Sequence, residues 1–390
     1  MISDKLAHLT EGEIEDLIQR YYNKEKVSDL INEFNISLNP SQLIKHFPPE
    51  ISDIECRYCD IKLIKPRKSR DSYSWNKTEA SCPKCGHREN LFCPCDNCYE
   101  IKKQKKEKEL QEKQHLLSQL FAIDEEGKIE LTALTFTERI YLGALLREGV
   151  SEDYNYIRPL REFLNPFAPM ANFQAEIIGH LLGNRVILIH PNTDAEFIEI
   201  TDPKQDSFGY YPDKVTWYLN VRSNDLNKVP LIESIINPSE LNELEFEEAL
   251  MLWKKIALHE SIEYFRYSIH HTLGIEYKIG DKTISVLKDL INDYAVSQIY
   301  GIIYKSTNNA LRLQAEKGIS KKHAANTIIG YAQSFGERAK VNHWDLVKYN
   351  RIRECPESAL SKFFFERIVK IGFRGFNERP TLELIVNNLS

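Results

Sequence analysis

The sequence has no long apolar run. None of its hydrophobic stretches approaches the roughly 20 residues that a transmembrane helix requires, so no contact with a membrane is expected. No secretory apolar segment opens the chain, and clustered cysteines without such a segment predict a reducing, cytoplasmic location. A Walker loop, a dinucleotide-binding glycine fingerprint and a nucleophile elbow are also missing, which argues against the enzyme classes built on them.

The composition indicates folded domains and two basic regions. The 390 residues are 42% hydrophobic, with 19 Tyr and 18 Phe, which is enough for two or three cores. The net charge of −6 conceals a segregation: residues 56–113 hold 15 Lys and Arg against 9 Asp and Glu, and residues 300–375 hold 14 against 6. Basic segments in an acidic chain favour an anionic partner such as nucleic acid, DNA or RNA. The alternative is that these charges only keep the chain soluble.

Seven of the eight cysteines fall between residues 56 and 98. Cys56 and Cys59 form one Cys-x2-Cys pair, and Cys82 and Cys85 form a second pair after a gap of 22 residues. Each pair can direct two thiolates at one ion from a tight turn, and two such turns complete a tetrahedron around Zn²⁺. Gly86 directly after the second pair suits this turn, because the backbone must curl there. The spacing predicts a structural zinc site.

A second group of donors follows the first. Cys93, Cys95 and Cys98 lie close to His87, and together they would make a second four-ligand zinc site. The alternative is three spare reduced thiols beside one zinc, with His87 in a solvated loop. Cys355 stands alone and is interpreted as a buried or idle thiol.

The two cysteine pairs and the segment between them resemble a zinc ribbon. The resemblance implies a β-hairpin between the pairs, and the inserted segment is rich in cations and aromatic residues. Cations there would hold phosphate while aromatic rings stack on bases, although a solvated hairpin whose rings pack on the ribbon is the alternative. The predicted nucleic-acid-binding residues are Lys65, Arg67, Lys68, Arg70, Tyr73 and Trp75.

Residues 1–50 show helical periodicity over 13–22, 26–34 and 41–47. This arrangement resembles a homeodomain-like helix-turn-helix, which implies a DNA-reading unit. Residues 1–55 nevertheless hold 5 basic and 11 acidic side chains, so a packing or protein-docking unit is the alternative.

The rest of the chain is predicted to be mostly helical. Residues 101–124 form a charged connecting helix, and residues 125–235 form a small α/β domain with helices over 137–147 and 172–182. That domain has candidate strands at 185–190, 196–200 and 215–221. Residues 236–390 form a helical bundle with helices over 240–271, 285–317, 320–342 and 356–372. The predicted class is therefore a multidomain, mostly α protein of the α+β type, with a helix-turn-helix-like unit at 1–50 and a zinc ribbon at 51–100.

Two Arg-x4-His stretches, Arg266 to His271 and Arg338 to His343, resemble the signature of HEPN ribonucleases. The resemblance implies acid/base chemistry at His and phosphate binding at Arg, and the second pair lies in a basic region. The alternative is a helix-end cation with a capping His. His259-Glu260-x2-Glu263 resembles the zincin helix, with an exposed charged helix face as its alternative.

Together these patterns predict a zinc-dependent nucleic-acid-binding protein with a regulatory or host-defence role. The zinc, one ion or two, would be structural, because a site closed by four protein ligands lacks the open position that catalysis needs. The alternatives are a HEPN-like ribonuclease using Arg338 and His343, and an interaction scaffold that binds a protein through the C-terminal bundle. An oligomer is compatible with each of the three.

Overall fold

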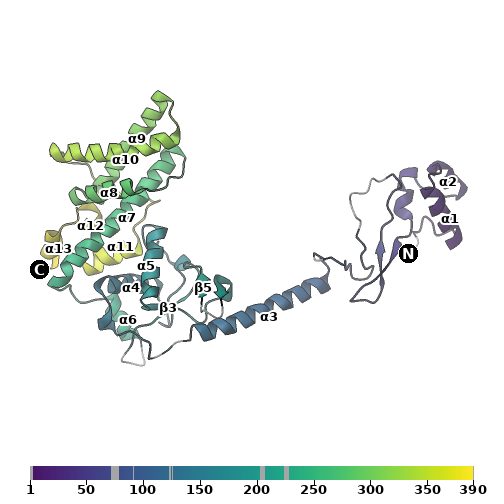
Figure 1. The fold of residues 1–390 in the computed structure, drawn as a ribbon, viewed down its shortest axis with the longest axis horizontal. Helices are drawn as coiled ribbons and strands as arrows, with labels where there is room; N and C mark the ends of the chain where they lie inside the picture. The colour runs from purple at the N-terminus through teal and green to yellow at the C-terminus, as the bar shows by residue number, and fades with distance from the viewer. Residues whose placement is uncertain are drawn as a thin grey trace. The chain divides into compact units, whose positions relative to one another are not determined.

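The computed structural model describes residues 3–71, 79–90, 92–122, 124, 126–202, 207–223 and 228–389. The chain divides into two compact units, Met1–Glu112 and Lys113–Ser390, and the boundary falls inside one long helix. The described residues are mostly helical, with a few short strands, as the sequence predicts (Figure 1). No helix among them has the length and apolarity that crossing a membrane requires.

The first unit begins with three short helical elements, α1 (Glu11–Tyr22), α2 (Val27–Glu33) and the 3-10 helix η1 (Pro40–His46). Thr10 starts α1 with a capping box, because its hydroxyl accepts from the Glu13 amide and its own amide donates to the Glu13 carboxylate at 2.8 Å. The third predicted helix is present as a 3-10 helix rather than an α-helix. The buried side chains of these elements form one apolar cluster, made of Leu6, Ile14, Leu17, Ile18, Tyr21, Leu30, Ile31, Ile36, Leu43 and Phe47.

A two-stranded antiparallel hairpin, β1 (Glu50–Glu55) and β2 (Lys62–Lys65), follows. Its register pairs Glu50 with Lys65 and Glu55 with Lys62, so acidic side chains face basic ones across the hairpin. The first cysteine pair lies in the turn between these strands, and Ser81, next to the second pair, bridges to Ile64 of β2. The hairpin thereby brings the two cysteine pairs together.

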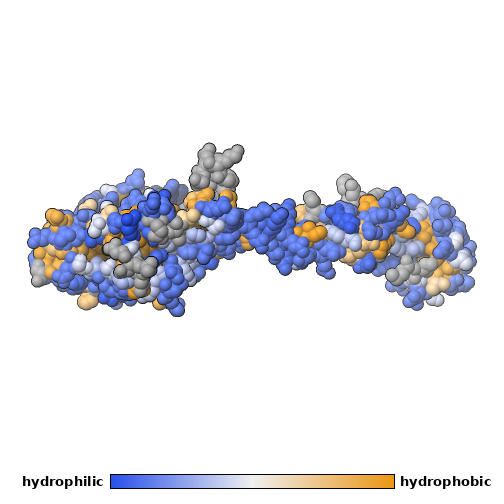
Figure 2. Space-filling model, turned by 90° about the horizontal axis from the view of Figure 1, so that it is seen from below, coloured by the Kyte–Doolittle hydropathy of each residue, from blue (hydrophilic) through white to orange (hydrophobic). Residues whose placement is uncertain are grey.

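Helix α3 (Asp96–Leu120) begins five residues before the predicted start of the connecting helix, so Cys98 lies in its first turn. Its lysines pair with glutamates four residues further on, for example Lys105 with Glu109 and Lys108 with Glu112, both at 3.8 Å. Most α3 side chains before residue 112 are exposed, and the surface of this helix is hydrophilic in Figure 2.

The second unit begins with a mixed region. Its elements in order are α4 (Phe136–Gly149), α5 (Ala171–Gly183), β3 (Ile187–Ile189), β4 (Ile198–Asp202), β5 (Ser207–Tyr210), β6 (Trp217–Leu219) and α6 (Val229–Ile236). Strand β3 pairs with β6, and β4 pairs with β5, so the three predicted strands belong to two separate two-stranded sheets. Strand β5 and helix α6 are additions that the sequence analysis did not predict.

The bundle follows. Its elements are α7 (Phe246–Leu273), α8 (Asp281–Asp293), α9 (Val296–Lys317), α10 (Lys321–Val341), α11 (Ala359–Phe363), the π-helix η6 (Phe364–Ile368), α12 (Arg374–Asn377) and α13 (Leu382–Leu389). Short 3-10 turns occupy η2 (Leu131–Ala133), η3 (Leu160–Glu162), η4 (Ala195–Phe197) and η5 (Glu243–Glu245). The predicted helix over 285–317 is two helices, because Tyr294 between them takes extended backbone angles. Ser320 caps α10, and Gly318 ends α9 with a φ of 63°, both as predicted.

The mixed region and the bundle share one core. Helix α4 packs on α11, and the amides of Ala359 and Leu360 donate to the carbonyl oxygens of Pro166 and Phe167 at 2.9 and 3.0 Å. The predicted segments 125–235 and 236–390 therefore lie within a single compact unit.

Candidate metal centres

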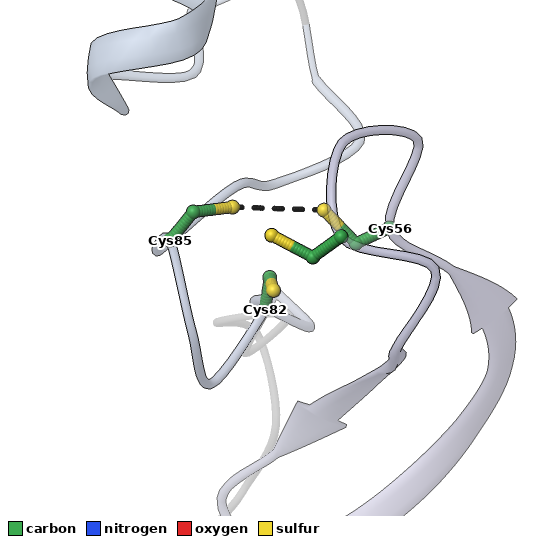
Figure 3. Close-up of side chains that lie close together, drawn as sticks. Cys56, Cys82 and Cys85 are labelled. Carbon is green, nitrogen blue, oxygen red and sulfur yellow. Dashed lines mark hydrogen bonds between the residues drawn. The ribbon is translucent and has the colours of Figure 1, made fainter.

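The two Cys-x2-Cys pairs form one group of four sulfur donors. The Sγ atoms of Cys56, Cys59, Cys82 and Cys85 all lie within 4.8 Å of one another, and those of Cys56 and Cys85 are 3.6 Å apart (Figure 3). Sulfur atoms bound to one tetrahedral Zn²⁺ are separated by about 3.8 Å, given Zn–S bonds of about 2.3 Å. All four are free thiols rather than disulfides, so the group matches the donor set of a tetrahedral metal site.

The two turns that carry these cysteines have the same backbone pattern. In each turn, the amide of the first cysteine donates to the carbonyl five residues later at 2.8 Å, and its carbonyl accepts the amide four residues later at 2.9 Å. The amide donors to that carbonyl are Asp60 and Gly86, whose φ values of 52° and 70° are left-handed. Gly86 was predicted to curl the backbone, and Asp60 takes the equivalent position in the first turn.

His87, Cys93, Cys95 and Cys98 form the second group of four donors. The His87 Nδ1 atom lies 3.3 Å from the Sγ atoms of Cys93 and Cys98, and 3.7 Å from that of Cys95. The imidazole is only 1% exposed, so the alternative of a solvated loop histidine is wrong. Both predicted ligand sets are thus assembled, and each could hold one metal ion.

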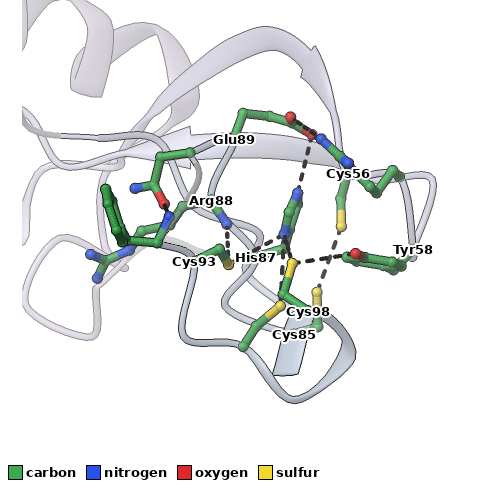
Figure 4. Close-up of polar contacts among 12 residues, drawn as sticks. Cys56, Tyr58, Cys85, His87, Arg88, Glu89, Cys93 and Cys98 are labelled. Atoms are coloured by element: carbon green, nitrogen blue, oxygen red, sulfur yellow. Dashed lines mark hydrogen bonds and ion pairs between the residues drawn. The ribbon is translucent and has the colours of Figure 1, made fainter. Parts of the chain in front are cut away.

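A chain of polar contacts supports the second group from outside. The other ring nitrogen of His87, Nε2, lies 3.1 Å from Glu89 Oε1, and Glu89 in turn accepts hydrogen bonds from the Arg57 guanidinium (Figure 4). The Tyr58 hydroxyl lies 3.3 Å from Cys98 Sγ, and its ring meets the imidazole edge to face at 4.9 Å. A carboxylate on the far nitrogen of a ligating histidine orients the ring and raises its basicity.

Arg57 and Tyr58 are the two residues between Cys56 and Cys59, so the first turn supports the second donor group. Neither these two residues nor Glu89 belongs to a motif that predicts a site from the sequence. Their only signal is their place between or beside ligands.

Backbone amides prepare one thiol in each group to be a thiolate. Burial alone would raise the pKa of Cys82, but the amides of Cys85 and Lys84 lower this pKa to about 7. Burial opposes ionisation of Cys93 as well, and the amides of Arg88 and Cys95 lower its pKa to about 6. The thiolate is the form that binds metal.

The arrangement leaves each site closed. Four protein donors already fill a tetrahedral shell, and such sites stabilise a fold rather than activate a substrate. The only buried apolar cluster that the described residues form around the first site consists of Cys56, Leu63 and Cys82. With so little apolar burial, a bound ion would supply most of the local stability.

Two of the predicted phosphate-binding residues are engaged within the unit. Arg67 donates to the Pro48 carbonyl at 2.9 Å, and Arg70 donates to the carbonyl oxygens of Tyr21 and Glu25 at 2.8 and 2.6 Å. Their side chains are 23% and 15% exposed, and the Arg70 guanidinium stacks 4.8 Å from the Tyr21 ring. These contacts fasten the segment that carries the two donor groups to the N-terminal helices.

The remaining predicted contact residues divide into two sets. Lys65 and Lys68 are half-buried, and the Lys68 carbonyl accepts the Tyr22 hydroxyl at 2.7 Å. Tyr73 and Trp75 lie outside the described residues.

The two Arg-x4-His pairs lie at the C-terminal ends of helices. Arg338 donates to the Ser334 carbonyl of its own helix, and His343 is exposed with a φ of 52°. Arg266 pairs with Glu276 at 3.7 Å, and His271 stacks on Tyr267. Within the described parts of the chain no hydrogen bond joins Arg to His in either pair, and the ribonuclease alternative stays a prediction.

The zincin-like stretch on α7 is not an exposed charged face. Glu260 is 1% exposed and accepts from Arg351 at 2.7 Å and from the Ser361 hydroxyl at 2.8 Å. Burial, followed by repulsion from Glu260, raises the pKa of Glu263 to about 8, although Arg351 opposes this rise. His259 lies elsewhere, stacked on the Phe173 ring at 4.0 Å, so the stretch forms no metal-binding group among the residues described.

Comparison with known proteins gives no relative for this chain: no family model, no curated protein and no solved structure matches it.

Proposed function

We propose that the protein is a zinc-dependent nucleic-acid-binding protein in which two structural zinc ions hold the first unit together. Support for zinc comes from the two donor sets, one of four thiols and one of three thiols and an imidazole. Such sulfur-rich tetrahedral sets select zinc over the oxygen-preferring ions Mg²⁺ and Ca²⁺. Nucleic-acid binding would serve the predicted regulatory or host-defence role.

Metal loading changes the charge argument for the first unit. Residues 56–98 hold nine Lys and Arg against five Asp and Glu, a balance of +4. Seven thiolates and two divalent ions would add −7 and +4, which leaves a balance of +1. Arg67 and Arg70 are also engaged with carbonyl oxygens. The loaded segment is therefore a weak attractor of phosphate.

The observation that carries the nucleic-acid proposal is a group of cations where α9 meets α10. Arg312, Lys317, Lys321 and Lys322 are exposed, and none has a carboxylate partner within the described parts of the chain. The lysines of α3, in contrast, already pair with glutamates of their own helix. Cations without partners gain most from phosphate, because they lose no ion pair on binding. The α9–α10 turn is the main phosphate contact in this proposal.

The test is the salt dependence of binding to 20-nucleotide single-stranded RNA, single-stranded DNA and duplex DNA, measured by fluorescence anisotropy. Replacing Lys317, Lys321 and Lys322 by Gln should weaken binding and flatten the plot of log affinity against log salt by about 2 to 3. Comparison of the three probes gives the preference for DNA or RNA.

The matched control replaces Lys103, Lys105 and Lys108 of α3 by Gln, which removes the same charge from self-paired lysines. This variant should keep a slope close to that of the parent protein. Equal slopes for the two triple variants would mean that the change in slope depends only on net charge. The α9–α10 turn would then no longer be part of the proposal. No binding of the parent protein to any probe at low salt would end it.

Protein docking through the bundle is the second candidate. From the last residue of α10 onward, the segment 341–347 exposes Val341, Trp344 and Val347, at 76%, 47% and 71%. Large apolar side chains grouped on a surface favour contact with another protein. The oligomeric state of Val341→Ser/Val347→Ser relative to the parent protein, by sedimentation, tests self-association through this segment.

A further inference from the structure

The second unit contains a large cavity that neither the metal centres nor the cationic turn uses. It lies among α4, the start of α5, α7, α8 and residues 277–279, is partly open to solvent, and has a volume of about 1290 Å³. Apolar side chains make up much of its wall, including Met251, Leu258, Ile262, Ile284 and Ile291. This is large enough for a small organic ligand, since ligand sites commonly span about 300–1,000 Å³.

Two buried polar atoms at this cavity have no hydrogen bond of normal length to a described residue. Tyr141 lines the cavity and is 2% exposed. Its hydroxyl interacts with the Lys255 ammonium, but it makes no hydrogen bond of normal length to any described residue. His259 Nδ1 is also a buried atom at this wall, and it makes no hydrogen bond to a described residue. Buried polar groups are nearly always satisfied in folded proteins, by protein, ligand or ordered water, so these two atoms are available to a molecule in the cavity.

Three polar side chains of the cavity wall gather around one aromatic ring, that of Phe173 at the start of α5. His259 stacks on Phe173, the Tyr141 ring centre is 6.4 Å from it, and the Lys255 ammonium is 5.1 Å from it. Ala171 lines the cavity in the first turn of α5, and Met170 before it supplies no side-chain cap. The first amides of α5 have no acceptor within their helix, and Ala171 and Asn172, which carry two of these amides, line the cavity.

The charge of the lining favours an anion. Five cations line the cavity against two carboxylates, those of Glu247 and Glu248; the cations are Lys254, Lys255, Arg266, Lys278 and Lys288. Lys255 pairs with Glu176 at 2.6 Å, while Lys278 and Lys288 have no carboxylate partner in the described chain. An acidic group at the Phe173 end would accept hydrogen bonds from the Tyr141 hydroxyl and the first amides of α5, and it would share the Lys255 ammonium with Glu176.

We propose that this cavity binds a small amphipathic anion. Its acidic group, a carboxylate or a phosphate, is held by the Tyr141 hydroxyl, the Lys255 ammonium and the first amides of α5, and its apolar body lies along α7 and α8. The proposal is independent of nucleic-acid binding, because none of the cations at the α9–α10 turn lines the cavity.

The test uses 8-anilinonaphthalene-1-sulfonate, an aromatic anion that fluoresces when buried, and its uncharged counterpart N-phenyl-1-naphthylamine. The full-length protein should bind one sulfonate probe per chain, and should bind the uncharged probe much more weakly. Tyr141→Phe and Lys255→Gln should each weaken sulfonate binding about tenfold or more, since each removes a hydrogen bond to a charged group. Lys362→Gln, an exposed cation on α11 away from the lining, should leave it unchanged.

Displacement of the bound probe by octanoate or by octyl phosphate identifies the acid group, and displacement by neither would overturn the proposal. Equal binding of the two probes would also overturn it, as would unchanged affinity in Tyr141→Phe. If Lys255→Gln fails to fold, Lys288→Gln takes its place, because Lys288 is exposed and its loss removes one lining charge without removing an ion pair.

Discussion

Two residues that are not ligands determine how the second donor group is held. Arg57 fixes the Glu89 carboxylate, and Glu89 fixes the far nitrogen of His87. These contacts also hold the pKa of Glu89 below its usual value, because Arg57 and then His87 hydrogen-bond to the charged carboxylate. Since Arg57 belongs to the turn of the first group, a change in the structure of that turn would also disturb the second group.

Glu89→Ala should therefore lower the affinity of the second donor group for zinc by about 10- to 100-fold and leave the affinity of the first group unchanged. The physical reason is that the imidazole loses the acceptor that fixes its tautomer and orientation. Competition with a chromophoric chelator measures both affinities in one titration. Glu55→Ala, an exposed carboxylate one residue before Cys56, is the control. Equal affinities in Glu89→Ala and the parent protein would show that the contact does not support the metal.

At the scale of elements, α7 has two faces with different surroundings: one lines the cavity, and the other is buried against Arg351. His259, Ile262 and Arg266 line the cavity, whereas Glu260 and Glu263 lie on an adjoining buried face with Arg351. Burial also shifts the pKa of one side chain on each face, in opposite directions. Burial, the largest effect, lowers the pKa of His259 to about 4, whereas burial raises that of Glu263 to about 8.

The pH dependence of unfolding follows from these shifts. Glu263 ionises near pH 4.5 in the unfolded chain and near pH 8 in the folded chain, so the folded state keeps a proton that the unfolded state has lost. Stability therefore falls as pH rises from 4.5 to 8, by up to a few kcal/mol. His259 works in the other direction, and stability falls as pH drops from 6.5 to 4.

Glu263→Gln should abolish the fall in stability between pH 4.5 and 8, and it should keep the fall in stability between pH 6.5 and 4 that is due to His259. Urea unfolding of the second unit at several pH values, followed by tryptophan fluorescence, measures the difference between variant and parent protein. That difference should grow between pH 5 and 8. Glu316→Gln, an exposed carboxylate of α9, should show no such growth. A difference that stays constant with pH would mean that Glu263 has the same pKa in the folded and the unfolded protein.

The elements that the sequence predicted best are those with local signals. Ser320 as a cap and Gly318 as a helix end depend only on neighbouring residues. The break between α8 and α9 at Tyr294 has no such signal, because its hydroxyl is held by the Gly336 carbonyl of α10 at 2.7 Å. The short strands β4 and β5 pair with each other instead of joining β3 and β6, a choice made by packing rather than by β propensity.

At the scale of the molecule, the two units differ in what stabilises them. The second unit has a large apolar core that includes Trp217, Trp253 and Phe364. The segment of the first unit that carries the two donor groups has few buried apolar residues besides its cysteines. Its stability should thus come from metal ligation rather than from hydrophobic burial.

Removal of metal with a strong chelator should therefore unfold residues 50–98 and leave the second unit folded. The loss is large, since structural zinc contributes on the order of 10 kcal/mol or more per site in small domains. Hydrogen exchange should show lost protection at the amides of Cys56 and Cys82, with unchanged protection in α7 and α9. Chelator saturated with zinc beforehand is the control. Persistent protection at both cysteine amides in metal-free protein would show that the segment folds without metal.

The sequence by itself determined the eight residues that could hold metal, because two such side chains in one tight turn are a local matter of spacing. It also determined most helices, whose caps and apolar periods are local as well. Only the tertiary structure decided where Arg67 and Arg70 bind, because their acceptors are carbonyl oxygens up to 49 residues away. The cavity is likewise a tertiary feature, since it exists only where side chains from residues 137 to 292 meet. Charge and polarity can be counted along a chain, but the partner of each group depends on which segments fold against one another.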